Sequence, residues 1–585
     1  MKKLLSFLLG IVIILSASAC GTKATDNKLT NPPVLSYIYV DEDENSFIAE
    51  KLKAAAEKAG LNLAAEAKDK EESEESLKNG TYFLSCGKVY SDSDNPLEFL
   101  EMWTSQSEKN VAQLGKGANK DSAVYSLDLT PYGGENIENA TWAETYDVLI
   151  GMIKSSTEKE NKFALMHLAE DFLMKTGCII PVYYDTDVYL ISEKLNGVYS
   201  DSRGCKFFTK AVIKDSANPL KASVCTEPDT LDPALNTSVS AGSVISHLFS
   251  GLAKWEEDEE GNVKAVPDLA EELSEGTENQ DGTVTYTYTL RKGVKWSNGD
   301  ALKASDFEKA VKRAALAKAS PDAEELFKDI KGYAEGTPEI SADDNKGAIT
   351  FILNKKTEDW NRRLANPAFF PVHPDTYEKQ DWGKEAAGFI SNGAYTLESW
   401  EYNSSITLKK NQNYINGDKV TAETISFCLS EDEKTVLEGF EKGEIQFVDE
   451  IDTSEIESLK IKYPNNIKSA DRKGTYYICW NVNQNLLGSS ALKGAEREAA
   501  QQEIRKAVGS LLDRNSIAED SAVGGKIPAS TLIPFGIEDA DQTEFYKNAN
   551  IGEGNCYTGY FDTAKETYND NVKKAEAILK KYYKF

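Results

Sequence analysis

Apolar and polar residues follow two periods in turn along this chain, that of a strand and that of a helix. Residues 34–40 alternate as in a strand, residues 46–60 carry apolar side chains at helical spacing, and residues 61–67 return to a strand pattern. Residues 141–174 contain two helical patterns, and residues 178–191 form an apolar run with aromatic side chains, typical of a buried strand pair. This succession predicts a mixed α/β lobe.

The second part of the chain starts a new series of elements. An acidic hairpin tip is predicted at 255–262, and residues 283–296 form the clearest strand, in which Val and Tyr alternate with Thr. Residues 305–308, Ser-Asp-Phe-Glu, fit a capping box and predict a helix start. The last predicted element is an amphipathic helix at 563–583. In an α/β lobe a strand normally follows such a helix, and the strand predicted at 34–40 is of the kind expected there.

Within residues 210–236 one structural unit is predicted to end and another to begin. A β-rich segment stops, the polar sequence Asp-Ser-Ala-Asn-Pro follows at 215–219, and a new strand then turns at Pro228 and Pro233. Residues 214–220 can span at most ~25 Å. The two segments that this linker joins therefore have ends that lie near each other.

The first twenty residues indicate export. Met1-Lys2-Lys3 is cationic, residues 4–15 are mostly apolar, and residues 16–20 are small, so residues 1–19 are predicted to be a signal peptide. The apolar run is shorter than the ~20 residues that span a bilayer. Cys20 at the cleavage point resembles a bacterial lipoprotein lipobox, in which that cysteine carries the lipid. Ala17 departs from the pattern, and ordinary signal-peptidase cleavage with secretion is the alternative.

Composition excludes several classes of function. The chain has 95 acidic against 66 basic residues and a formal net charge of −29, the wrong sign for binding nucleic acid phosphates. A hydrophobic content of 40% excludes a largely disordered chain. The seven cysteines after Cys20 contain no C-x-x-C spacing, so neither a zinc ribbon nor a dense disulfide framework is predicted.

No catalytic constellation is apparent in the sequence. The chain has three histidines, and His167 and Glu170 share a helix turn but lack the second histidine of a zinc site of the zincin type. Neither a Gly-x-Ser-x-Gly elbow nor a glycine-rich phosphate loop occurs. We therefore expect no enzyme activity, no metal and no cofactor.

Several stretches carry a resemblance to a known family. They read LRKGVKWSNGDALKASDFEKAVKR at 290–313, SNGAYTLESWEYNSSITLKKNQNYING at 391–417, GEIQFVDEI at 443–451, TYYICWNVN at 475–483 and IRKAVGSLLDRNSI at 504–517. In this order they resemble the family 5 solute-binding proteins of peptide and oligopeptide ABC transporters. The resemblance covers essentially all of residues 221–585.

The part before residue 221 resembles the remaining, C-terminal portion of the same family. Residues 34–63 look like the strand and helix that normally follow a helix such as that at 573–585, and residues 90–100 match its Asp-x-x-x-Pro stretch. Residues 163–213 resemble the family's usual ending. The chain thus resembles a circular permutant, in which the ordinary C-terminus continues through the 214–220 linker into the ordinary N-terminus. An artefact of sequence assembly or gene fusion is the rival explanation.

The resemblance implies an α/β, two-lobed fold like that of periplasmic binding proteins (type II, the large class with an extra subdomain). After the signal peptide 1–19 and a lipoprotein tether 20–33, residues 34–183 and 478–585 would form one lobe, which holds the ligand's α-amine. Residues 184–261 and 386–477 would form the second lobe, and residues 262–385 the extra subdomain. The lobes of such proteins close on the ligand by hinge motion.

The resemblance also implies a site for peptides. Ser238 and Val239 match one lobe's ligand positions, and Lys88, Val89 and Tyr90 match the other's. Asp92 matches the carboxylate that pairs with a peptide's α-ammonium; the alternative is that Asp92 or Asp94 caps the helix that begins near Leu97. Three further residues next to the predicted hinge could line the cleft or could pack in the core: Tyr183, Tyr476 and Trp480.

The expected protein is an extracytoplasmic monomer, anchored by lipid on Cys20 to the outer face of the cytoplasmic membrane. Its partners would be a peptide ligand and the membrane permease of an ABC transporter, with no nucleic acid. Val89 sits where oligopeptide binders often carry Trp, so the length of the peptide is left open. The same fold could bind a nickel chelate, a sugar or an opine, and an inert surface homologue is a third possibility.

Overall fold

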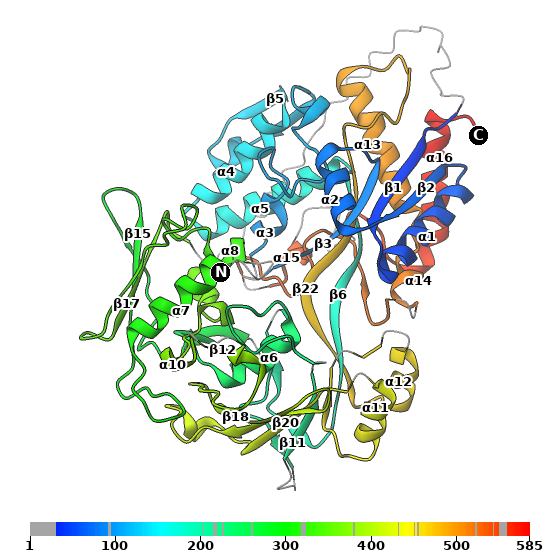
Figure 1. Ribbon diagram of the computed structural model, residues 1–585. Helices are drawn as coiled ribbons and strands as arrows, with labels where there is room; N and C mark the ends of the chain where they lie inside the picture. Colours follow the sequence, from blue (N-terminus) through cyan, green and yellow to red (C-terminus); the bar gives the residue numbers. More distant parts are fainter. Residues whose placement is uncertain are drawn as a thin grey trace, which may run out of the picture.

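Two lobes joined by a pair of long strands make up the molecule (Figure 1). The computed structural model describes residues 31–585 except for the following residues: 92–94, 202, 215–218, 225–226, 259–260, 262, 318–322, 358, 378, 380, 431, 450, 453–454, 521–522, 542 and 549–558. The predicted signal peptide, Cys20, Asp92 and Asp94 therefore lie outside the described residues. Within the described part, no helix combines the length and the apolar character needed to cross a membrane.

An eleven-stranded sheet connects the two lobes. Across it the strands run β18 (Tyr395–Glu401), β19 (Ser405–Lys410), β20 (Thr424–Cys428), β11 (Leu220–Ser223), β21 (Phe447–Val448), β6 (Ile179–Ile191), β22 (Ile467–Trp480), β3 (Leu84–Tyr90), β1 (Val34–Val40) and β2 (Asn62–Lys68), and β23 (Ile527–Pro528) pairs with β6. The antiparallel strands β6 and β22 pass from one lobe to the other (Figure 1). We call them the crossing strands.

Buried apolar side chains form two large cores, one on each side of this crossing. The first core takes its residues from 35–183 and 476–583. Its helices include α1 (Asp43–Lys58), α4 (Val148–Ser155), α5 (Lys159–Lys175), α13 (Gly494–Ser510) and α16 (Tyr568–Tyr582). The second core takes its residues from 195–447. Apolar burial thus groups the two ends of the described chain into one body and its middle into another.

The second core contains a small sheet of its own. Strands β14 (Thr277–Glu278), β15 (Val284–Thr289), β17 (Ala348–Leu353) and β16 (Ile340–Asp343) pair in that order. Alternate side chains of β15 are buried, as the Val/Tyr and Thr alternation predicts. The helices α6 (Val239–Leu248) and α7 (Ala304–Ala317) also belong to this core.

The element predictions are mostly confirmed. The strand predicted at 34–40 is β1, the two helical patterns within 141–174 contain α4 and α5, and the acidic hairpin joins β12 (Ala253–Glu257) to β13 (Val263–Pro267). The charged run 68–76 lies largely in α2 (Lys70–Asn79), a solvated helix whose first turn is capped by Asp69.

Two local predictions are wrong. Residues 179–191 form the single strand β6 and not a strand pair, because β22 pairs along its length and no turn interrupts it. The capping box at Ser305 is absent, since α7 already begins at Ala304. The Ser305 hydroxyl instead bonds Asp344 at 2.8 Å, and the Asp306 carboxylate accepts from the Lys303 amide at 2.9 Å.

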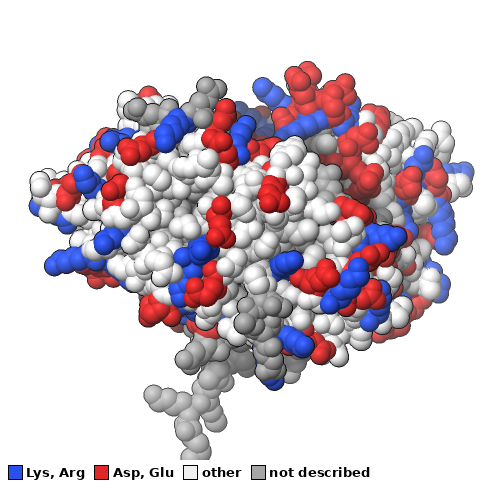
Figure 2. All heavy atoms as spheres, turned by 60° about the horizontal axis from the view of Figure 1, so that its bottom comes forward, with Lys and Arg blue, Asp and Glu red and all other residues white. Residues whose placement is uncertain are grey.

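Figure 2 shows one face of the molecule, on which acidic and basic side chains are interspersed and do not gather into a basic stripe. Among the described residues, no group of His, Cys, Asp and Glu is arranged to hold a metal ion.

Candidate functional site

Three of the sequence-predicted residues form a row across neighbouring strands. Tyr476 of β22 pairs with Lys88 of β3 on one side and with Tyr183 of β6 on the other. Residues directly opposite each other in a sheet project from the same face. The Tyr183 and Tyr476 rings are stacked, with centroids 5.0 Å apart. The row therefore presents two phenols and one ammonium group on one face of the sheet at the crossing.

The N-terminal turn of α1 covers this row. Glu44 accepts a hydrogen bond from the Tyr183 hydroxyl and forms an ion pair with Lys88 at 2.6 Å, while Asn45 Oδ1 accepts from the Tyr476 hydroxyl at 2.8 Å. Burial, reinforced by the nearby Glu44 carboxylate, raises the pKa of Tyr183, so that its hydroxyl stays protonated and donates. The α1 turn and the strand row are thus locked together.

Tyr183, Tyr476 and Trp480 are all buried, at 0%, 1% and 1% exposure. The two tyrosine hydroxyls bond to α1, and in the described part of the chain the Trp480 indole N–H has no acceptor. All three belong to the first core. Their contacts are those of core residues, the alternative that the sequence left open beside a role in lining the cleft.

Tyr90 stands at the end of β3 and remains 41% exposed. Its hydroxyl donates to Asp185 of β6 at 2.6 Å, and Lys526 forms an ion pair with the same carboxylate. Burial alone would raise the pKa of Asp185, but Lys526 and the two hydrogen bonds hold it below its ordinary value. Asp185 therefore stays ionised and fixes the Tyr90 side chain against the crossing strand.

A second buried charge cluster ties the crossing strands to the second lobe. Lys206, whose side chain is 1% exposed, pairs with Asp187 of β6 and with Asp449 at 3.0 Å, and Arg472 of β22 bonds Asp187 at 3.3 Å. Burial raises the pKa of Asp449 to about 7. Burial opposes the charge on Lys206, but the two carboxylates raise its pKa above its ordinary value. The ammonium group therefore stays charged.

Ser238 and Val239 lie on the second lobe, at the start of α6. Ser238 is the N-cap, and its hydroxyl accepts from the Ala241 amide at 3.2 Å. Both residues line a pocket of about 600 Å³, open solvent at its mouth included, together with Arg203, Cys205 and residues between 314 and 368. Neither Lys88 nor Tyr90 is among the described residues that line this pocket.

Gly204 links this pocket to the crossing. A Cβ placed on Gly204 would lie 3.3 Å from the Arg472 guanidinium and 3.5 Å from Asp187, and its φ of +95° favours glycine. The flanking Arg203 and Cys205 line the pocket. The pocket therefore begins next to the buried charge cluster at the crossing strands.

Sequence reasoning missed Glu44, Asp185 and Lys206. Glu44 belongs to the acidic run 41–44 directly after a predicted strand, a signal that could have marked it. Asp185 and Lys206 bond to Lys526 and Asp449, which are far from them in the sequence. Only the tertiary fold brings these charges together.

Comparison with known proteins gives a consistent answer. The family model described as "Bacterial extracellular solute-binding proteins, family 5 Middle" matches residues 264–582. Oligopeptide-binding protein OppA of Bacillus subtilis is 29% identical over 349 residues, which are 56% of this chain and 59% of that protein. Dipeptide-binding protein DppE of the same organism is 26% identical over 333 residues, 54% of this chain and 56% of that protein. The match thus spans less than two thirds of these relatives' lengths.

Two solved structures are also similar. OppA of Burkholderia pseudomallei is 22% identical, with a TM-score of 0.43 over 62% of this chain and 67% of that chain. The murein tripeptide binding protein MppA of Escherichia coli is 25% identical, with a TM-score of 0.38 over 43% of this chain and 49% of that chain. The family model matches more than half of the 585 residues of this chain. The chain therefore belongs to the bacterial extracellular solute-binding proteins of family 5.

Proposed function

We propose that this protein captures peptides between its two lobes, outside the cytoplasmic membrane, and delivers them to the permease of an ABC transporter. Family membership supports the binding role. The observation that carries the proposal is the placement of Lys88, Val89 and Tyr90 on β3, which pairs with the crossing strand β22. The Ser238 pocket lies beside the charge cluster that joins both crossing strands. The two sets of candidate residues thus flank one crossing.

The edge of β3 offers a place for a peptide backbone. β1 pairs with β3 only at Tyr37 and Leu84, whereas β22 pairs with β3 from Leu84 to Tyr90. Among the described strands, residues 87–90 therefore have no partner on the side away from β22. An extended peptide can add to such an edge through main-chain hydrogen bonds, which are common to all peptides and give broad specificity.

Closure of the lobes would bury the ligand, with β6 and β22 as the hinge. The clusters around Asp185 and Lys206 support this role, because they fix side chains of both lobes to the crossing strands at close range. Asp92, which the family resemblance matches to the ligand's α-ammonium, would fix the register of the peptide through a charge-assisted hydrogen bond.

A thermal melt tests the proposal. A pool of peptides of two to five residues should raise the midpoint by mass action, and N-acetylated copies should raise it much less. Asp92→Asn should abolish the preference for free amines, while Asp94→Asn, a matched change two residues away, should retain it. No rise with any peptide, from a cooperatively melting protein, would exclude peptide capture. It would direct the search to nickel chelates, sugars and opines, or to an inert homologue.

Anchoring is a separate part of the proposal. We propose that Cys20 carries lipid and holds the protein at the outer face of the cytoplasmic membrane, with residues 20–33 as the tether. Two acyl signals on one cysteine are sufficient for stable attachment. Mass spectrometry of the mature N-terminus distinguishes lipidated Cys20 from a free terminus left by ordinary cleavage, which would mean secretion.

We also propose that the chain is a circular permutant, with lobes 34–183 plus 478–585 and 184–261 plus 386–477, and the extra subdomain 262–385. The two apolar cores support the separation of the lobes, since one core draws on both ends of the described chain. The other core joins the second lobe and residues 262–385 in one cluster. The position of Phe585 supports the permutation too. Its ring packs against Gly60, so closely that a Cβ added at Gly60 would lie 2.5 Å from it. Asn62, two residues further on, pairs with Val34 at the start of β1. The helix α16 thus ends beside the start of β1.

A further inference from the structure

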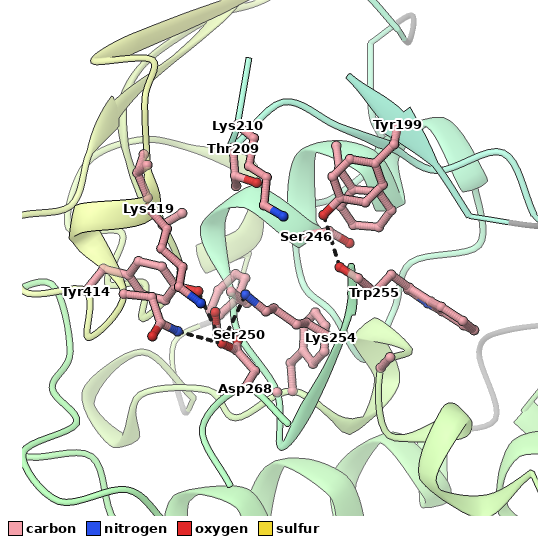
Figure 3. A pocket seen from close by; sticks show the side chains of 18 residues that line it. Tyr199, Thr209, Lys210, Ser246, Ser250, Lys254, Trp255, Asp268, Tyr414 and Lys419 are labelled. Carbon is pink, nitrogen blue, oxygen red and sulfur yellow. Dashed lines mark hydrogen bonds and ion pairs between the residues drawn. The ribbon is translucent and has the colours of Figure 1, made fainter. Parts of the chain in front are cut away.

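A second pocket lies inside the second lobe, and we call it the junction pocket (Figure 3). Its walls come from the end of α6, from β12, from residues 199–210 and from the loop 414–420. Residues 262–385 contribute Asp268, Ala365 and Phe370. The space around it is about 650 Å³ when the open solvent at its mouth is included, and the part that the centre of a water-sized sphere can occupy is about 50 Å³. It shares no lining residue with the Ser238 pocket.

Aromatic side chains form much of the wall. Phe207, Phe249 and Phe370 line the pocket, and the Tyr199 ring stacks on Phe207 with centroids 5.0 Å apart. The Tyr199 hydroxyl is already used, since it donates to the Trp255 carbonyl at 3.0 Å. The aromatic rings can therefore contact a flat or branched apolar group, and they carry no charge.

Three lysines line the same pocket. Lys210 pairs with Glu256 at 2.7 Å, and Lys254 lies 3.3 Å from Glu256 and 4.0 Å from Asp268. Lys419 is exposed, and among the described residues no carboxylate lies within ion-pair distance of its ammonium group. Lys419 is therefore the lining cation that is available to a ligand.

Asp268 is the one carboxylate among the lining residues, and it is turned to the protein. It is 1% exposed, and its Oδ1 accepts from Tyr414 at 3.2 Å and from Asn416 at 3.1 Å (Figure 3). These contacts hold the loop 414–420 and keep the carboxylate below the pocket surface. The Oδ2 of Asp268 is buried and has no hydrogen-bond partner among the described residues. With Glu256, which pairs with Lys210 and Lys254, three ammonium groups stand against two carboxylates, so the positive charge of Lys419 is left unbalanced in a chain of net charge −29.

We propose that the junction pocket binds a small carboxylic acid with an aromatic or branched apolar body. The carboxylate pairs with Lys419, and the body lies against the phenylalanine walls. A locally cationic pocket on an acidic protein concentrates small anions and rejects cations. The junction pocket is separate from the proposed peptide cleft. The protein would therefore bind a second ligand that is not enclosed when the lobes close.

Calorimetric titration with benzoate tests this, beside benzamide as its neutral isostere and benzylamine as its cationic counterpart. Benzoate should bind the wild-type protein, benzamide at least tenfold more weakly, and benzylamine not at all. Lys419→Gln should weaken benzoate fivefold or more. The control Lys573→Gln removes an exposed lysine of α16 that pairs with Asp570, and should leave benzoate binding unchanged.

Measurements of peptide binding distinguish the junction pocket from the proposed peptide cleft. Lys419→Gln should leave the response to peptides unchanged, and saturating peptide should not displace benzoate. The proposal is overturned by absent benzoate binding at millimolar concentration, by equal affinity for benzamide, by an unaffected Lys419→Gln variant, or by displacement of benzoate by peptide. Benzoate binding by a protein that ignores peptides would uphold the junction pocket and contradict only the peptide proposal.

Discussion

Single buried residues set the pH response of the first lobe, and Glu170 is the clearest case. It is fully buried in α5, its Oε1 accepts from the amides of Leu532 and Ile533 at 3.0 and 2.9 Å, and its Oε2 has no partner among the described residues. Burial raises its pKa to about 8 despite these two bonds. The side chain is therefore mostly a neutral acid at pH 7.

This makes stability fall as pH rises. Between pH ~4.5 and ~8 the folded protein keeps a proton that the unfolded chain releases, which costs on the order of 1 kcal/mol per pH unit. Glu170→Gln keeps an oxygen that accepts from the Leu532 and Ile533 amides and removes the group that titrates. The melting midpoint of the variant should therefore exceed that of the wild type by an amount that grows from pH 5 to pH 8. Parallel wild-type and variant profiles would show that Glu170 does not titrate in this window.

At the scale of elements, strand pairing at the crossing depends on a missing side chain. Gly474 of β22 pairs with Tyr90, whose ring would lie 2.2 Å from a Cβ at that position. The ring can lie flat on the strand only because position 474 is glycine. In this place it reaches Asp185, which anchors the end of β3 where the proposed peptide edge lies.

Gly474→Ala should therefore displace Tyr90, destabilise the protein by about 1 to 3 kcal/mol and weaken peptide binding. Gly151→Ala is the matched control, because Gly151 lies in α4 with no atom within 4 Å of an added Cβ. This change should stabilise by roughly 0.5 to 1 kcal/mol through helix propensity. Urea unfolding measures both, and equal stability of Gly474→Ala and wild type would mean that the Tyr90 ring moves freely.

For the whole molecule, the order of the segments should matter less than their contacts. The first core unites residues 35–183 with 476–583, and Phe585 packs beside Gly60 near the start of β1. Surface breaks that leave a core intact are well tolerated. The permutation proposal therefore predicts that a second permutation is harmless.

A chain of residues 219–585 followed by a short Gly/Ser linker and residues 34–214 should fold to the same structure and bind the same peptides. Circular dichroism, the melting midpoint and peptide titration check this against the present order. A chain that opens at residue 300 instead, inside the extra subdomain's contacts, is the control for a disruptive break. An unfolded product from the 219–585 order, beside a folded present order, would contradict the proposal.

Most local elements and the family could be predicted from the sequence alone. Strand alternation at β1 and β15 and the helical patterns at α4 and α5 depend on neighbouring residues only, so they could be read directly. Motifs such as that at 290–313 are contiguous, which is why the resemblance was visible. Where local pattern competed with tertiary context, at β6 and at the start of α7, the prediction was wrong.

The contacts of the candidate residues depend on segments that meet only in the folded chain. Whether Tyr183 and Tyr476 line a cleft or pack in a core depends on Glu44 and Asn45 of α1, which no periodicity connects to them. The charge cluster of Lys206, Asp187 and Asp449 and the junction pocket are assembled from distant segments. Burial and charge pairing depend on distances in space, and a linear pattern carries these only within one helix or strand.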